Sequence, residues 1–317
     1  MNGKQNGMKR IFSRATVWLS AIAAVTLAGN VFAAPKITVA TTTTMVTDMV
    51  RQIGGDRITV QGLMGPGVDP HLYKPAASDG LKLNRAKAIF YSGLMLEGRL
   101  SDLFARIGRR GKKVYPVTEG IPEESLLEPE EFEGHWDPHV WGDPRLWEKC
   151  VDVVVEGLSV LDRAGSIGFK RRGATYKKEL AALHVWAKER IAEVPKEQRV
   201  LVTSHDAFNY FGNAYGLQVV GVQGISTVDR AGLADIAKTA DFIKQRGVKA
   251  VFVESSVSPA VIERISKDAG VKIGGELFSD ACGQPGQMES GGGESYDVGT
   301  YIGMIKHNVN TIVEALK

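Results

Sequence analysis

The chain has 317 residues, enough for one large or two medium-sized domains with a sizeable buried core. Its 44% hydrophobic and 24% charged residues are ordinary for a soluble globular protein. The formal net charge is only +3, and the sequence contains no basic stripe or basic patch interleaved with aromatic residues, so nucleic acid is not an expected partner.

Residues 1–33 have the pattern of a secretory signal peptide. Four basic side chains come first, at Lys4, Lys9, Arg10 and Arg14. An apolar run over residues 15–29 follows, shorter than the roughly 20 residues that a membrane-spanning helix needs, and small residues end at Ala33. We therefore predict cleavage near Ala33 and export to the periplasm. Removing this segment takes four positive charges from the net of +3, which leaves about −1 for the mature chain.

Export places the two cysteines, Cys150 and Cys282, where a disulfide would persist. They are 132 positions apart and lie in different halves, so the sequence does not indicate that they pair. Neither stands at the predicted cleavage point, so a lipid-modified amino terminus is not indicated. Cys282 follows Asp280 closely and could be a soft metal ligand, but a small buried residue is the favoured interpretation.

β-branched runs alternate with helical patterns through the first half of the mature chain. We predict strands at residues 36–41, 57–63, 86–93 and 112–117, and helices at residues 45–53, 76–85 and 99–107. Prolines and glutamates over residues 121–133 predict a loop, and a helix follows at residues 144–161. This alternation is typical of βαβ units and a parallel sheet.

Apolar residues recur at three- and four-residue spacing over residues 168–194, which predicts one helix of more than 25 residues that ends at Pro195. The alternation then resumes. We predict strands at residues 199–205, 217–223, 249–255 and 271–280, and helices at residues 207–215, 233–246, 259–269 and 301–316. The glycine-rich segment over residues 283–299 predicts a mobile loop.

The predicted fold class is therefore α/β, with two similar lobes of mainly parallel sheets flanked by helices and joined by one long rigid helix. The predicted boundaries are residues 34–166 for the first lobe, 167–196 for the linking helix and 197–317 for the second lobe.

Four polar residues follow predicted strands, where open parallel sheets place their ligand sites. His71 comes after the second strand, His139 lies in a loop before the helix at residues 144–161, and His205 and Asp280 end strands of the second lobe. Three imidazoles and one carboxylate suit a four-coordinate divalent metal such as zinc, at about 2.0 to 2.1 Å from each nitrogen. Calcium and magnesium prefer oxygen, whereas iron, copper and nickel also accept imidazole.

Two of these side chains, His71 and His139, are the last residue of the same triplet, Asp-Pro-His, in "GVDPHLYKP" and in "HWDPHVW". Pro70 and Pro138 fix the backbone just before His71 and His139, so each ring is presented from a stiff loop. Preorganised ligands reduce the ordering cost of metal capture.

The other histidines are assigned structural positions. His184 and His307 lie within predicted helices. His135, four residues before His139, could assist metal capture, but an exposed loop residue is the favoured interpretation. Side chains near strand and helix ends are candidates for orienting the ligand histidines through the second ring nitrogen, namely Glu254, Ser255 and Asp143.

With these residues laid out, the chain resembles the metal-binding subunits of bacterial zinc and manganese ABC importers, the TroA-like solute-binding proteins. The matching stretches are "GLMGPGVDPHLY", "DPHVW", "LVTSHDAFNYFGNAYG", "AVFVESSVSP" and "GGELFSD". Together they span nearly the whole mature chain, and five ordered motifs are more specific than any one of them.

The resemblance implies two lobes joined by a rigid helix, with the metal buried between them and little lobe movement. By position it implies the same ligands, His71, His139, His205 and Asp280. It also implies a membrane permease with a cytoplasmic ATPase as partner, and a monomer. Strongly manganese-selective relatives carry glutamate at the position of His205, and many zinc-specific ones carry a histidine-rich loop where this chain has only His135. Neither feature is present, so the favoured cargo is Zn2+, then Mn2+, with Fe2+ as a further candidate.

Two other classes of function fit the sequence less well. A secreted zinc hydrolase would use Glu254 or Asp206 as general base, but four ligands leave no open position for water, and the sequence has no His-Glu-x-x-His stretch. A binder of haem or a siderophore would need an aromatic or arginine-lined cleft. The aromatic residues after His205 have the spacing of a helix core face instead. An adhesin role would be additional to metal binding.

Overall fold

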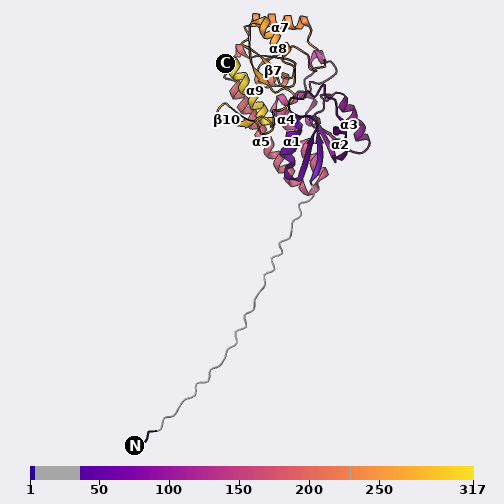
Figure 1. The fold of residues 1–317 in the computed structure, drawn as a ribbon, viewed down its shortest axis with the longest axis vertical. Helices are drawn as coiled ribbons and strands as arrows, with labels where there is room; N and C mark the ends of the chain where they lie inside the picture. The colour runs from indigo at the N-terminus through magenta and orange to yellow at the C-terminus, as the bar shows by residue number, and fades with distance from the viewer. Residues whose placement is uncertain (4–35, 229) are drawn as a thin grey trace. The chain divides into compact units, whose positions relative to one another are not determined.

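The computed structural model describes residues 1–3, 36–228 and 230–317 (Figure 1). Apart from residues 1–3, the predicted signal peptide and its cleavage point lie outside the described residues. Pro35–Lys317 form one compact unit. Within the described part of the chain, no helix has both the length and the apolar character needed to cross a membrane.

The first half of this unit contains one four-stranded parallel sheet in the order β2-β1-β3-β4. Its strands are β1 (Ile37–Thr41), β2 (Ile58–Gly62), β3 (Ala88–Tyr91) and β4 (Lys113–Pro116), and its helices are α1 (Thr44–Gly54), α2 (Ala77–Arg85) and α3 (Arg99–Arg109). The central strands are fully buried at Val39 and Phe90, as expected for a parallel sheet covered by helices. Helix α1 begins where the Thr43 hydroxyl accepts a hydrogen bond from the Val46 amide.

Two long helices follow, α4 (Pro144–Leu161) and α5 (Ser166–Ile191). Helix α5 confirms the predicted long helix and ends shortly before Pro195. It packs against α1 and α4 on one side and against α6 (Asn209–Tyr215) and α9 (Tyr301–Leu316) on the other. Helix α5 therefore joins elements from both halves of the chain.

The second half contains two pairs of parallel strands, β5 with β6 and β7 with β8. The strands are β5 (Val200–Thr203), β6 (Gln218–Gly221), β7 (Ala250–Glu254) and β8 (Lys272–Leu277), and the remaining helices are α7 (Leu233–Arg246) and α8 (Ala260–Ala269). Strand β5 lies beside β7. Figure 1 shows α7 and α8 at the opposite end of the unit from α2 and α3. The α/β class and the mainly parallel sheets are confirmed.

The prediction of a loop over residues 283–299 was wrong, because the segment contains an antiparallel hairpin of β9 (Met288–Gly291) and β10 (Glu294–Asp297). Its two-residue turn is Gly292-Gly293, with φ values of 59° and 82° that favour glycine and suit a tight hairpin. The Asn310 side-chain amide donates a hydrogen bond to the Tyr296 hydroxyl, which ties β10 to α9. Glycines and glutamates concealed this hairpin, since neither residue is typical of strands.

Short 3-10 turns occupy several connections, including parts of the predicted loop at residues 121–133. They are Gly55–Arg57, Val117–Gly120, Glu123–Ser125, Glu130–Phe132, Val140–Gly142, Arg163–Gly165 and Lys196–Gln198.

The largest hydrophobic core draws on both halves of the chain. Its fully buried members include Val39 and Trp147 from the first half and Phe252 and Ile312 from the second. Two smaller cores lie apart from it, one containing Phe104 and the other containing residues of α7 and α8. Large relative movement of the two halves would have to disrupt the shared core, because protein interiors are close-packed.

Candidate metal centre

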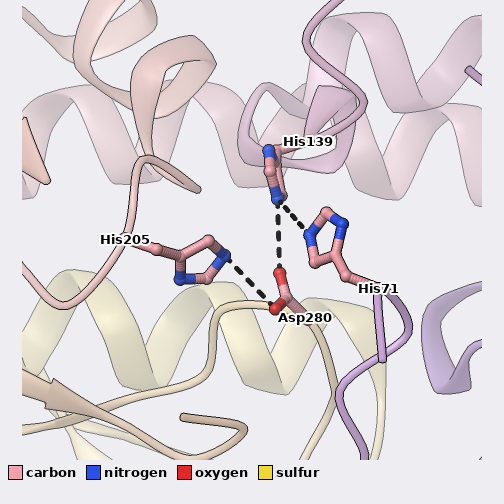
Figure 2. A group of neighbouring side chains, drawn as sticks. All are labelled: His71, His139, His205 and Asp280. Carbon is pink, nitrogen blue, oxygen red and sulfur yellow. Dashed lines mark hydrogen bonds and ion pairs between the residues drawn. The ribbon is translucent and has the colours of Figure 1, made fainter. Parts of the chain in front are cut away.

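The four residues predicted from strand ends lie together in the structure (Figure 2). One ligand atom from each of His71, His139, His205 and Asp280 lies within 4.8 Å of the others. His71 is in the loop after β2, His139 precedes α4, His205 follows β5 by two residues and Asp280 follows β8 by three. Parallel strands in both halves thus direct their carboxyl ends toward one point.

The spacing between these side chains matches a small coordination shell. The Nε2 atoms of His71 and His139 are 3.3 Å apart, His139 Nε2 is 3.5 Å from Asp280 Oδ1, and His205 Nε2 is 3.3 Å from Asp280 Oδ2. Ligands at about 2.0 to 2.1 Å from a tetrahedral zinc would be about 3.3 Å apart. The four side chains therefore fit a divalent transition metal without a large rearrangement.

Burial leaves polar atoms at this point without hydrogen bonds, although His205 Nε2 and Asp280 Oδ1 lie within ion-pair distance of Asp280 Oδ2 and His139 Nε2, respectively. His139, His205 and Asp280 are at most 1% exposed, and His71 is partly buried. His205 Nε2 and Asp280 Oδ1 have no hydrogen-bond partner among the described residues. Unsatisfied buried polar atoms are costly, and a bound metal would satisfy both of them.

The Asp-Pro-His triplets explain how two of the rings are positioned. The His71 amide donates a hydrogen bond to Asp69 Oδ1 at 2.8 Å, and the His139 amide donates to Asp137 Oδ1 at 2.9 Å. In both triplets the intervening proline has no N–H to compete for the carboxylate, so the aspartate closes a local turn onto the histidine backbone.

Two buried carboxylates contact the Nδ1 atoms of His139 and His205, the ring nitrogens opposite those that face the ligand group. Asp137 Oδ1 is 2.8 Å from His139 Nδ1. Glu254 Oε2 is 2.6 Å from His205 Nδ1, and Glu254 Oε1 accepts a hydrogen bond from the His205 amide. A carboxylate at this nitrogen fixes the ring orientation and increases the basicity of the nitrogen that faces the metal.

Of the three candidates for this orienting role, only Glu254 has it. Asp143 instead caps α4, where its side chain accepts a hydrogen bond from the Arg145 amide. The serine that contacts the group is Ser256, next to Ser255 in the sequence, and its hydroxyl donates a hydrogen bond to Asp280 Oδ2 at 3.2 Å. Sequence reasoning missed Asp137, although its place in the repeated Asp-Pro-His triplet was a usable signal.

The electrostatics of the site differ from ligand to ligand. Burial lowers the pKa of His71 to about 3, so this ring is neutral at physiological pH. Burial also opposes a charge on His205, but Glu254 and Asp280 outweigh burial and raise the pKa of His205 above its ordinary value. Burial would raise the pKa of Asp280, yet His205 and His139 reverse that shift and lower it. The Asp280 carboxylate is therefore ionised, and the two acidic neighbours of His205 favour its charged form.

The remaining histidines lie outside this group. His135 is exposed, as predicted, and its ring lies 5.2 Å from that of Phe132. His184 stacks on Tyr215, and His307 pairs with Glu289 on the hairpin.

The cysteines and the aromatic residues of α6 also lie outside the ligand group. Cys150 and Cys282 are both free and buried, and burial raises the pKa of each thiol. The aromatic residues after His205 are at most 5% exposed and belong to the main core, which confirms a packing role for Phe208, Tyr210, Phe211 and Tyr215.

Residues 39–315 match the protein-family model described as "ZnuA: Zinc-uptake complex component A periplasmic". The chain belongs to this family. The match covers both halves of the chain and all four clustered residues, so the resemblance inferred from five short motifs is confirmed over nearly the whole mature chain.

Among similar proteins is the manganese-binding lipoprotein MntA of Bacillus subtilis (strain 168), 42% identical over 287 residues that cover 89% of this chain and 90% of the relative. The zinc-binding protein TroA of Treponema pallidum (strain Nichols) is also 42% identical, over 286 residues and 89% of both chains. A solved structure of the periplasmic zinc-binding protein TroA from Treponema pallidum matches with a TM-score of 0.83 and 41% identity, covering 89% of this chain and 99% of that one.

Proposed function

We propose that this protein captures a divalent transition metal outside the cytoplasm and delivers it to an ABC permease. The ligands in this proposal are His71, His139, His205 and Asp280. The observation that carries it is the convergence of one ligand atom from each residue within 4.8 Å of the others, with three of the pairs at 3.3 to 3.5 Å. The metal is cargo, and no reaction is performed on it, because four protein ligands fill the shell that a catalytic zinc would leave open to water.

Zinc is the favoured cargo, followed by manganese, with iron(II) as a further candidate. Three imidazoles suit zinc better than manganese, which prefers oxygen ligands. The relatives do not decide between the two metals, since one named for manganese and one named for zinc each have 42% sequence identity to this chain.

The receiving partner in this proposal is an integral-membrane permease with a cytoplasmic ATPase. The chain is exported, cleaved near Ala33 and free in the periplasm as a monomer. Residues 34–166 and 197–317 act as lobes, with residues 167–196 as the rigid connection. The core shared between the halves supports a limited lobe movement on binding. Mass spectrometry of the protein from its native periplasm would give the mature amino terminus, and sedimentation would give its oligomeric state.

Replacing one ligand tests the site. We expect His71→Ala to lower zinc affinity by at least 100-fold in calorimetry, because the metal loses one of four bonds, while circular dichroism stays unchanged. His135→Ala is the matched control, since it removes an exposed imidazole outside the group and should bind like the unaltered protein. Unchanged zinc affinity in His71→Ala would show the ligand assignment to be wrong.

The identity of the cargo needs a separate measurement. Elemental analysis of protein purified from its native periplasm without chelators, together with competition between zinc and manganese, addresses it. We expect zinc to be the metal found in the purified protein and the metal that stays bound in the competition. Preferential retention of manganese would overturn the choice of metal and leave the site assignment intact.

A further inference from the structure

A groove of about 640 Å³ lies beside the candidate metal centre, and its lining is both basic and apolar. The residues that decide its chemistry are His71, Leu72, Lys74, Arg99, Arg106 and Val228. Leu72 and Val228 are 53% and 62% exposed. No aspartate or glutamate is among the described residues that line it.

The groove is built on one face of α3. Arg99 and Arg106 are seven residues apart, which places them on the same side of the helix two turns apart. Gly98, just before the helix, approaches the loop of the first ligand so closely that a Cβ there would lie 3.7 Å from the His71 carbonyl oxygen. Its φ of 48° also favours glycine, so the start of α3 is set directly against this loop.

The described residues that line the groove provide no carboxylate to neutralise its cations. Lys74, Arg99 and Arg106 form no ion pair with any residue that the structure describes, and all three are exposed. Three positive charges at this place repel a free divalent cation, so the groove is not arranged to attract one. They attract carboxylates, and the exposed apolar side chains between them favour a protein segment over a small anion.

His71 is the ligand that such a segment would meet. It lines the groove, whereas His139, His205 and Asp280 are at most 1% exposed. His139 and His205 each have a carboxylate at Nδ1, from Asp137 and Glu254, but the described residues provide no such partner for His71. His71 is therefore both the most accessible and the least restrained of the four.

We propose that this groove is the docking surface for an acidic, apolar segment of the receiving permease, and that the metal leaves through it. This inference rests on the proposed function. A carboxylate oxygen of the segment, drawn in by Arg99 and Arg106, bonds to the metal as the bond to His71 Nε2 breaks. The metal keeps its charge, no electron is transferred, and the His71 ring is left neutral. Carboxylate is an accepted ligand of zinc and manganese, so the exchange is chemically balanced.

Metal removal by chelators of different charge tests the exit route. The probe is nitrilotriacetate, an anionic tricarboxylate, and the neutral chelator phenanthroline is its comparison. We expect Arg99→Glu combined with Arg106→Glu to slow removal of zinc by nitrilotriacetate about tenfold at low salt, with a smaller effect at high salt and little effect on phenanthroline. The matched control is Arg85→Glu with Arg109→Glu, which makes the same charge change at exposed arginines of the same half outside the groove. It should behave like the unaltered protein.

Zinc affinity is measured first, by calorimetry, so that the two proposals fail separately. Absence of zinc binding in the unaltered protein would overturn the proposed function. Intact binding with equal removal rates in the groove variant and the control would overturn only the exit route. A removal rate that does not depend on nitrilotriacetate concentration would also overturn it, because the metal would then leave before the chelator arrives.

Uptake of zinc by cells that produce the chain together with its permease tests the docking surface. We expect the groove variant to lower uptake severalfold at unchanged zinc affinity, and the control pair to support normal uptake. Normal uptake with the groove variant would overturn the docking surface. So would self-association of the unaltered protein that the groove variant abolishes, since the groove would then be covered by a second copy.

Discussion

Glu254→Gln separates two effects that one buried carboxylate exerts on the same ring. Glu254 is 2% exposed, lies 2.6 Å from His205 Nδ1 and accepts the His205 amide proton. Glutamine keeps the size and one acceptor oxygen but removes the charge. Loss of a carboxylate behind a ligand histidine typically lowers metal affinity by about 10- to 100-fold, which corresponds to about 1.4 to 2.7 kcal/mol.

The pH dependence of that loss is the sharper test. Glu254 also raises the pKa of His205, so in the unaltered protein a proton competes with the metal. Without the charge this competition weakens, because burial then favours the neutral ring. We therefore expect the full affinity loss at alkaline pH and a smaller loss as the pH falls.

Calorimetric titration with zinc at several pH values measures both effects, with thermal unfolding to confirm that the variant is folded. Glu97→Gln is the matched control. Glu97 is an equally buried carboxylate that binds the Thr42 hydroxyl and the Ser92 amide and has no contact with a ligand histidine. It should lower stability and leave zinc affinity unchanged. An affinity loss in Glu254→Gln that is the same at every pH would refute the proposed coupling between Glu254 and His205.

Three further predictions concern His205, Thr227 and Gly303. Because the pKa of His205 is raised, we expect zinc binding below that pKa to release a proton, and zinc affinity to fall about tenfold per pH unit in that range. His71, with a pKa of about 3, adds no pH dependence to zinc affinity at neutral pH. Calorimetry in buffers of different ionisation enthalpy counts the released proton. Thr227→Val removes a 2.6 Å hydrogen bond to Asp69 that joins the His71 loop to the second half, so zinc dissociation, followed by stopped flow, should accelerate about tenfold. Gly303→Ala should destabilise the metal-free protein by about 1 to 3 kcal/mol in thermal unfolding, since its Cβ would overlap the Asp297 carbonyl, whereas Gly80→Ala, in open space on α2, should not.

The elements that sequence reasoning located best are those with a strong period or a sharp stop. The long amphipathic pattern before Pro195 gave α5, and apolar runs followed by polar residues gave the strands of both halves. The clustering of His71, His139, His205 and Asp280 was expected because open parallel sheets place their ligand sites beyond the carboxyl ends of their strands, and each half supplies two of these residues. Their role as metal ligands remains a prediction.

What the sequence did not indicate depends on contacts between distant segments. The hairpin of β9 and β10 is stabilised partly by Asn310 on α9, and no local pattern announces that contact. The groove is lined by Val228 of the second half and by Arg106 of the first, a combination that only the packing of the two halves creates. The partner of His139 is a different case, since Asp137 is two residues away and the repeated triplet contained it.

The choice of metal turns on Asp280, because both of its oxygens face the ligand group. Oδ1 lies 3.5 Å from His139 Nε2 and Oδ2 lies 3.3 Å from His205 Nε2, so the carboxylate is oriented to offer either one or two bonds. The Ser256 hydroxyl already donates to Oδ2, and this hydrogen bond weakens Oδ2 as a metal ligand relative to Oδ1. A shell of three nitrogens and one oxygen is the tetrahedral arrangement that zinc adopts, whereas a second oxygen would move the site toward the higher coordination and oxygen preference of manganese. The hydrogen bond from Ser256 therefore acts in favour of zinc, in the same direction as the imidazole of His205.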